Sequence, residues 1–383
     1  MRKTTASLIT AIAATCTAPS HAAVTDMDAN DNINFNVYAS VNVSAITAWN
    51  GGSAGPQNFT PARVAYDGSS NLYLGVWDND WSTSNPSSII KVSNVLSNPV
   101  ASLTNMKYKL NPGTPLTGLD YNNGSLIASY CSNPYAFNKP DSYVISYNTA
   151  NESTNWKYVG DGNNVGHQPT SGAAFNPATG KTTFYSMGYT AYEIDNAGSV
   201  KITTTPSMTN PNRPVGILAL DFDKHGNAAY IDFSLKQKKG AVSYSAYNAK
   251  TNKYTSTTAF TFTGNDTLYN SRGYDIALIT LENQAPLFAI SLAAGTTATT
   301  NTGVTLNDSA VFILDNQGKL VAKAAQGWAN VHGVDFVNNT LVVTNAHSET
   351  IEFISVSVPE PASFALLSLA SLPLLIRRNR RSH

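Results

Sequence analysis

A unit of strand, turn and strand recurs six times along the chain, and this repeat restricts the fold more than any other feature. Each copy begins with a short apolar strand, and the residues that mark these six strands are Tyr66, Tyr121, Phe175, Phe222, Ile279 and Phe336. The intervals between them are 55, 54, 47, 57 and 57 residues. A regular period of this kind is typical of units that pack side by side because none can bury its apolar face alone.

Further strands complete most of the copies. Turn formers such as Asp67-Gly68 and Asn122-Asn123-Gly124 separate the first strand from a second apolar strand, as a hairpin requires. Third and fourth strands follow in five copies, whereas the sixth copy reaches Pro359 without a fourth strand. Six copies of up to four strands predict an all-β, six-bladed β-propeller over residues 24–356. A seven-bladed propeller and a pair of β-sandwiches are the alternatives.

An N-terminal segment can supply the missing strand of the sixth copy. Residues 33–43 alternate between apolar and polar side chains, which is the period of a half-buried strand. We expect this segment to pair antiparallel with residues 350–354 as the outer strand of the last blade. Such pairing closes the ring and removes two open sheet edges.

The first 23 residues have the pattern of a secretory signal peptide. Arg2 and Lys3 precede an apolar and small-residue stretch over residues 8–14, and Ala22-Ala23 offers a small-residue cleavage site. The sequence therefore predicts export across the inner membrane and a mature chain that begins at Ala23 or Val24.

The C-terminal segment, residues 357–383, contains Pro359-Glu360-Pro361, an apolar run over residues 364–376 and the basic residues Arg377, Arg378, Arg380 and Arg381. This order resembles the PEP-CTERM sorting signal of exosortase substrates in Gram-negative bacteria. The resemblance implies a transient inner-membrane tether and processing by an exosortase-like enzyme. It also implies transfer to the cell surface or extracellular space, with association with exopolysaccharide in a biofilm matrix or with a surface protein.

Charge argues against nucleic-acid binding, and cysteine content argues against a fold held by an intrachain disulfide. Six of the 24 basic residues lie in the two terminal segments, which leaves 18 against 23 or 24 acidic residues in the mature chain. This balance argues against a nucleic-acid partner, whose binding needs clustered Lys and Arg. Cys131 is the only cysteine left after removal of the signal peptide, so an intrachain disulfide cannot form.

Three aspartates, Asp120, Asp221 and Asp335, stand directly before the marker residues of the second, fourth and sixth copies. Three carboxylates around a central channel could hold a cation. Carboxylates at this place in propeller blades also accept hydrogen bonds from neighbouring backbone, and that structural interpretation is the preferred one. No cofactor is expected.

A ligand-binding face is predicted from the order of strands. Because neighbouring strands are antiparallel, the connections from second to third strands and those from one blade to the next open on the same face. Aromatic, Arg and His residues fall in these connections: Trp77, Trp81, Tyr135, Phe137, His167, Arg213, Arg272, His332 and His347. Aromatic rings beside directed polar groups suit a sugar-binding surface. The alternative is that the aromatic rings pack within their own loops.

Three functional classes are compatible with these features. The first is a non-catalytic propeller that binds glycan or protein in an extracellular polysaccharide matrix. The second is a secreted hydrolase or lactonase with a divalent cation in the central channel. The third is a purely structural component of the surface or matrix.

Overall fold

The structure is a computed structural model, and it describes residues 24–27, 33–42, 59–78, 88–97, 99–103, 116–130, 143–159, 172–185, 191–203, 217–234, 239–264, 275–292, 295–327, 332–345, 348 and 350–358. These residues form 27 strands and no helix. Accordingly, the described part of the chain contains no helix with the length and apolar character needed to cross a membrane.

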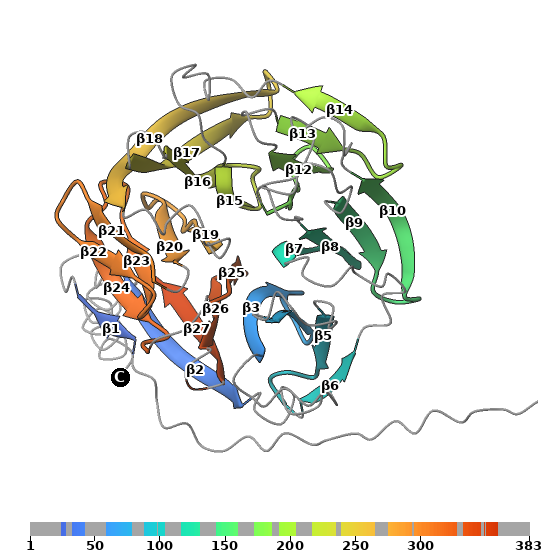
Figure 1. Ribbon diagram of the computed structural model, residues 1–383, viewed down its shortest axis with the longest axis horizontal. Coiled ribbons are helices and arrows are strands. Elements are labelled where there is room, and N and C mark those ends of the chain that lie inside the picture. The colour runs from blue at the N-terminus through green and yellow to red at the C-terminus, as the bar shows by residue number, and fades with distance from the viewer. Residues whose placement is uncertain are drawn as a thin grey trace, which may run out of the picture.

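Six antiparallel sheets surround a central axis as the blades of a propeller (Figure 1). Blades 1 to 3 follow one another along the chain, each from its inner to its outer strand. Their strands are β3 (Phe59–Tyr66), β4 (Leu72–Asp78), β5 (Ser88–Ser93) and β6 (Val100–Leu103); β7 (Leu116–Asn122), β8 (Ser125–Tyr130), β9 (Tyr143–Asn148) and β10 (Ser153–Val159); β11 (Ala174–Asn176), β12 (Lys181–Tyr185), β13 (Ala191–Ile194) and β14 (Val200–Thr203).

Blades 4 to 6 complete the ring. Their strands are β15 (Ile217–Phe222), β16 (Ala228–Ser234), β17 (Lys239–Asn248) and β18 (Lys253–Gly264); β19 (Asp275–Ile279), β20 (Leu287–Ser291), β23 (Val311–Leu314) and β24 (Leu320–Ala324); β25 (Val334–Val337), β26 (Thr340–Asn345), β27 (Thr350–Ser357) and β2 (Asn34–Asn42). The prediction of a six-bladed propeller is confirmed, and its two alternatives are wrong. The six sequence repeats correspond to the six blades.

The N-terminal strand closes the ring as predicted. Strand β2 pairs antiparallel with β27, from Asn34 opposite Ser357 to Asn42 opposite Thr350, with a register shift between Val37 and Ala39. In Figure 1 the blue β2 runs beside the orange-red β27, although some three hundred residues separate them in sequence. Blade 6 therefore combines strands from both ends of the described chain.

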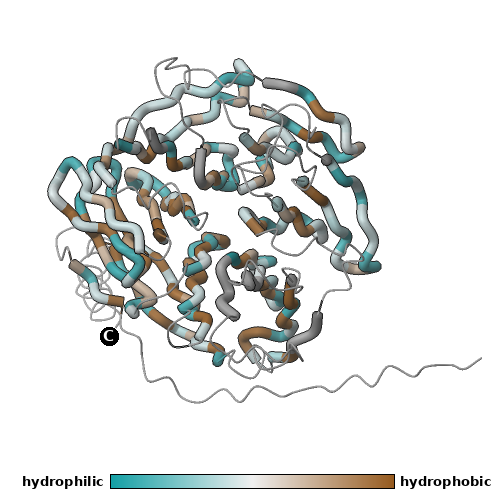
Figure 2. The backbone as a smooth tube through the Cα atoms, viewed as in Figure 1, coloured by the Kyte–Doolittle hydropathy of each residue, from teal (hydrophilic) through white to brown (hydrophobic). Residues whose placement is uncertain are grey.

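Apolar side chains fill the space between adjacent blades. Between blades 6 and 1, for example, the buried core contains Val41, Leu74 and Phe353, and the rings of Tyr66 and Phe353 meet edge to face with centroids 5.4 Å apart. Figure 2 shows hydrophobic residues along the strands and many hydrophilic ones at the turns. Burial of apolar surface on both faces of each blade is the main term that stabilises the ring.

Two additions to the six blades were not predicted. The connection between β20 and β23 of blade 5 forms a hairpin, β21 (Thr297–Thr300) and β22 (Thr305–Asn307), and β21 pairs with the outer strand β18 of blade 4. At the start of the described chain, β1 (Thr25–Asp26) pairs with β24 of blade 5. Both additions cover outer edges that would otherwise expose unpaired backbone groups.

Strand β2 allows a matched test of ring closure. Val41 is 2% exposed in the core between blades 6 and 1, whereas Asn36 on the same strand is exposed. We expect Val41→Asp to lower the free energy of unfolding by about 3 kcal/mol, because it buries a charge without a partner. Asn36→Asp should leave stability within about 0.5 kcal/mol of the parent. Chemical denaturation of both variants measures the difference, and equal stabilities would contradict the closed ring.

Candidate functional site

The inner strand of each blade has one edge that faces the central channel and pairs with no other strand. Side chains from a neighbouring blade contact this edge. Four aspartates accept hydrogen bonds from backbone N–H groups of the next blade around the ring. Asp120 binds the N–H of Phe175 at 2.5 Å, Asp221 that of Leu278 at 2.7 Å, Asp275 that of Val334 at 3.0 Å and Asp335 that of Tyr66 at 2.6 Å. These interblade hydrogen bonds satisfy edge amides that no strand pairs.

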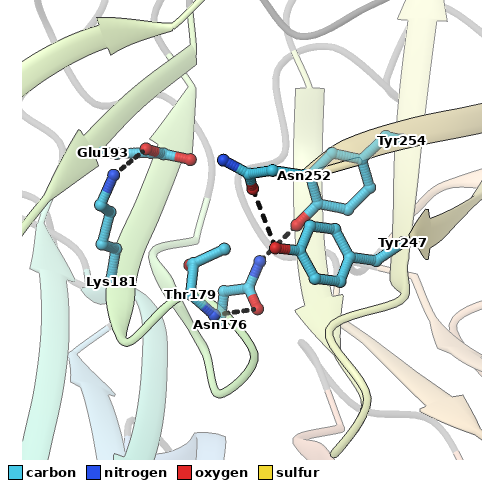
Figure 3. A network of polar contacts seen from close by, with 7 residues as sticks. All are labelled: Asn176, Thr179, Lys181, Glu193, Tyr247, Asn252 and Tyr254. Atoms are coloured by element: carbon cyan, nitrogen blue, oxygen red, sulfur yellow. Dashed lines mark hydrogen bonds and ion pairs between the residues drawn. The ribbon is translucent and has the colours of Figure 1, made fainter. Parts of the chain in front are cut away.

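Different groups join the two remaining junctions. Between blades 1 and 2, Nε of the buried Arg63 donates to the carbonyl oxygen of Thr117 at 3.0 Å. Between blades 3 and 4, Nδ2 of Asn176 donates to the hydroxyl of Tyr254, as Figure 3 shows. Every junction of the ring thus has a directed polar contact from a side chain.

The polar network of Figure 3 extends the junction between blades 3 and 4. The Asn176 side-chain oxygen accepts a bond from the Thr179 N–H at 3.4 Å, and the Tyr247 hydroxyl donates to Oδ1 of Asn252 at 2.8 Å. Lys181 forms an ion pair with Glu193 at 2.8 Å on the blade 3 side. These contacts order the turns of both blades and leave Lys181 neutralised by its neighbour.

Burial in the channel raises the pKa of all four aspartates. Desolvation is the largest cause in each case, and it raises the pKa of Asp335 to about 8 and those of Asp120 and Asp275 to about 6. The pKa of Asp221 is raised well above its usual range. Repulsion among the carboxylates adds to the effect at Asp221 and Asp335, whereas the Arg63 guanidinium lowers the pKa of Asp275.

The geometry favours the structural interpretation of Asp120, Asp221 and Asp335 over the metal-binding one. Their oxygens already accept backbone hydrogen bonds, and in the described residues no group of three or more His, Cys, Asp or Glu side chains could hold a metal ion. The cavity that they line along the axis has a volume of about 20 Å³, which is room for about one water molecule.

Above this cavity the channel widens into a funnel of about 260 Å³. The funnel opens on the face formed by the turns between first and second strands, which we call the turn face. Its lower wall includes Asp120, Asp221 and Asp335, and half-buried aromatic rings surround them: Tyr121, Phe175, Phe222 and Phe336. These rings are the marker residues of four sequence repeats, so the repeat that identifies the fold also builds this funnel.

A second hollow of about 460 Å³ lies on the same face between blades 2 and 3. It shares Asn122 and Phe175 with the funnel, and its walls carry asparagine and hydroxyl side chains. The predicted ligand face is the opposite one. Of these asparagines, the sequence marked only Asn122 and Asn123, as turn formers. Their clustering depends on the packing of two blades, so spacing along the chain gave no signal for it.

Most residues of the predicted ligand face lie outside the described residues: Trp81, Tyr135, Phe137, His167, Arg213, Arg272 and His347. Trp77 belongs to β4, but its side chain lies outside the described part. These seven loop residues and Trp77 therefore stay predictions.

The prediction that His332 belongs to the ligand face is wrong. Its side chain is 0% exposed, and its ring nitrogens lie 3.0 Å from the carbonyl oxygen of Thr344 and 3.2 Å from that of Gly327. The His332 N–H also donates to the hydroxyl of Ser291 in blade 5 at 2.9 Å. These contacts place His332 in the interior between blades 5 and 6 and not on an exposed ligand surface.

Glu352 is a buried acid that the sequence reasoning missed. It lies on β27 and accepts a hydrogen bond from Nδ2 of Asn345 at 3.4 Å. Burial raises its pKa to about 7, and hydrogen bonds from Asn345 and the Ala325 backbone oppose that rise. The only sequence signal was a single Glu in the apolar strand Thr350–Ser357.

Comparisons with known proteins add distant structural likenesses. No family model matches the chain, and no curated protein matches it. Among solved structures, a protein of unknown function from Bacteroides thetaiotaomicron is similar at 9% identity with a TM-score of 0.45, over 85% of this chain and 76% of that one. A catalytically inactive virginiamycin B lyase from Staphylococcus aureus, solved with quinupristin, is similar at 11% identity and a TM-score of 0.45, over 84% of this chain and 99% of that one. Likenesses this distant say nothing about ligand or activity.

The raised pKa values predict a stability that falls with increasing pH. A carboxyl group with a raised pKa in the folded state stabilises the fold fully below its unfolded pKa of about 4 and loses that contribution as pH rises. For Asp335 the loss extends to about pH 8. Thermal melts between these limits should show a declining melting temperature.

Asp335→Asn provides the specific test. The amide can still accept the Tyr66 N–H but carries no charge, so the decline between pH 4 and 8 should be shallower than in the parent. Asp335→Ala, as a control, loses both the charge and the hydrogen bond, so it should be less stable than Asp335→Asn by about 1–3 kcal/mol at every pH. A decline of equal slope in the parent and Asp335→Asn would contradict the assignment.

Proposed function

We propose that the protein is an exported, non-catalytic binding propeller that associates with exopolysaccharide at the cell surface or in the extracellular biofilm matrix. The observation that carries this proposal is the use of the channel carboxylates. Asp120, Asp221 and Asp335 each accept a backbone hydrogen bond from the following blade, so they stabilise the ring. A ring held by these bonds, with hollows on its turn face, suits recognition of a ligand because little ordering entropy is lost on binding.

The export part of the proposal depends on the two ends of the chain. Residues 1–23 and 359–383 lie outside the described residues. The sequence patterns of residues 1–23 and 357–383 support a signal peptide and a sorting signal that resembles PEP-CTERM. We propose an exosortase-like enzyme as the processing partner and a transient tether in the inner membrane. The mildly acidic mature chain supports a partner other than nucleic acid.

Processing can be tested by the intact mass of the protein from its native host. We expect the mature chain to begin at Ala23 or Val24 and to lack Arg377–His383, because the basic segment follows the processing motif at Pro359-Glu360-Pro361. Replacing Glu360 by Ala should retain the tail and hold the protein at the membrane. Secreted parent protein that still carries the basic tail would contradict the sorting-signal proposal.

Association with glycan can be tested with exopolysaccharide purified from the same host. The parent chain should cosediment with it, and the Trp81→Ala, Phe137→Ala, Arg213→Ala and Arg272→Ala variants test the predicted loop face. Normal binding by all four folded variants would exclude that face. Metal analysis of the same preparation is the control: stoichiometric Ca²⁺ or Zn²⁺ would favour a metal-dependent hydrolase or lactonase instead.

A further inference from the structure

We infer that the hollow between blades 2 and 3 is a binding groove for a neutral oligosaccharide. The inference rests on the proposed function, because it takes a glycan as the ligand. It goes further in choosing the turn face and an uncharged ligand. We call this hollow the asparagine groove, and its polar walls are formed by Asn122, Asn123, Asn148, Asn155, Asn196 and the hydroxyls beside them.

Packing between the two blades creates the groove. The shared core of blades 2 and 3 contains Ile127, Val144 and Phe184, but toward the turn face the facing positions are Ser125, Ser146 and Thr182. These short side chains fill less space than the apolar residues deeper in the interface. A hollow of about 460 Å³ remains, which is within the range of roughly 300–1,000 Å³ for small-ligand sites.

A β-bulge in β10 positions Asn155 in the wall of the groove. The register between β10 and β9 shifts between Thr154 and Trp156, so Asn155 has no paired residue on β9. Bulges commonly re-aim a side chain. Nδ2 of Asn155 lies 3.2 Å from Oγ of both Ser125 and Ser146, and no hydrogen bond to Oδ1 is found within the described residues. This carbonyl oxygen can therefore accept a ligand hydroxyl.

Three further asparagines of the groove are likewise available. Asn122, Asn123 and Asn196 make no side-chain hydrogen bond to other described residues, although all three line the groove. By contrast, the side-chain oxygen of Asn148, which also lines the groove, accepts the backbone N–H groups of Ala150 and Asn151. An amide that offers both a donor and an acceptor matches a sugar hydroxyl, which does the same.

The groove also has an apolar floor held in place by packing. Phe175 is half-buried, and the Trp156 ring beneath is 9% exposed. Gly198 has a φ of +82°, and a Cβ there would lie 2.8 Å from Cβ of Trp156, so the turn that carries Asn196 packs directly on this residue. An ordered floor reduces the entropy lost on binding, and the Phe175 ring can contact the apolar face of a sugar.

The lining residues select against charged ligands. They include asparagine, serine, threonine, isoleucine, tryptophan and phenylalanine, and no Lys, Arg, Asp, Glu or His among the described residues lines the groove. The positive charge of Lys181 in blade 3 is balanced by its ion pair with Glu193. An acidic sugar would lose hydration without gaining a counter-charge, so a neutral glycan is the chemical class that fits.

Isothermal titration calorimetry on the full chain tests the inference with defined probes. Neutral gluco-, manno- and galacto-oligosaccharides are compared with an oligogalacturonate of similar length. We expect the parent to bind at least one neutral probe and to bind the acidic probe more weakly. Asn155→Ala and Asn196→Ala should each weaken the bound neutral probe about three- to tenfold, as expected for the loss of one hydrogen bond.

Two matched controls separate the groove from general effects. Asn36→Ala removes another exposed strand asparagine, and Phe222→Leu alters the marker residue of blade 4, which lines the funnel but not the groove. Both should bind as the parent does, whereas Phe175→Leu should bind about tenfold more weakly because the aromatic surface is lost. Melting temperatures confirm that each variant is folded.

Each outcome distinguishes the two proposals. If the parent binds a neutral probe and the folded Asn155→Ala, Asn196→Ala and Phe175→Leu variants bind equally well, the groove is not the site and the proposed function stands. Stronger binding of oligogalacturonate would overturn the neutral class. If neither these probes nor host exopolysaccharide bind, both the groove inference and the proposed function are wrong, and a purely structural role is favoured.

Discussion

The interblade hydrogen bonds around the central channel are the interaction on which the rest of the structure depends. Each blade is a separate antiparallel sheet, and its inner strand has backbone N–H groups that no further strand can pair. Asp120, Asp221, Asp275 and Asp335 accept four of these groups, each from the next blade in the ring. The bonds fix both the spacing and the tilt of neighbouring blades, and the apolar cores between blades then pack in one register.

This arrangement has an electrostatic cost. Four carboxyl groups converge on a channel with room for about one water molecule, where desolvation and mutual repulsion both disfavour the charged form. Arg63 offsets part of the charge at Asp275, and the backbone amides stabilise the remaining carboxylates. The four aspartates therefore fix the geometry of the ring, but their contribution to its stability depends on pH.

The two faces of the propeller acquire different properties from the same topology. The strand ends that lead into the connections between blades lie on one face, and short hairpin turns rich in asparagine lie on the other. Because blades splay outward from the axis, the short turns of neighbouring blades stand apart where their facing side chains are small. Between blades 2 and 3 this separation leaves an uncharged groove that is continuous with the wall of the funnel at Asn122 and Phe175.

The sequence alone determined the number of blades and the closure of the ring. The number of blades follows from the regular interval between the marker residues, from Tyr66 to Phe336. The closure follows from the alternating pattern of residues 33–43. Both are local properties of the sequence. It also indicated the structural use of Asp120, Asp221 and Asp335. Only the tertiary structure decided that Asp275 and Arg63 join them, that the hairpin β21–β22 pairs with blade 4, that His332 is buried, and where the asparagines gather. These features depend on which blade faces which across the ring, and distances between blades are not encoded in the spacing of residues within one.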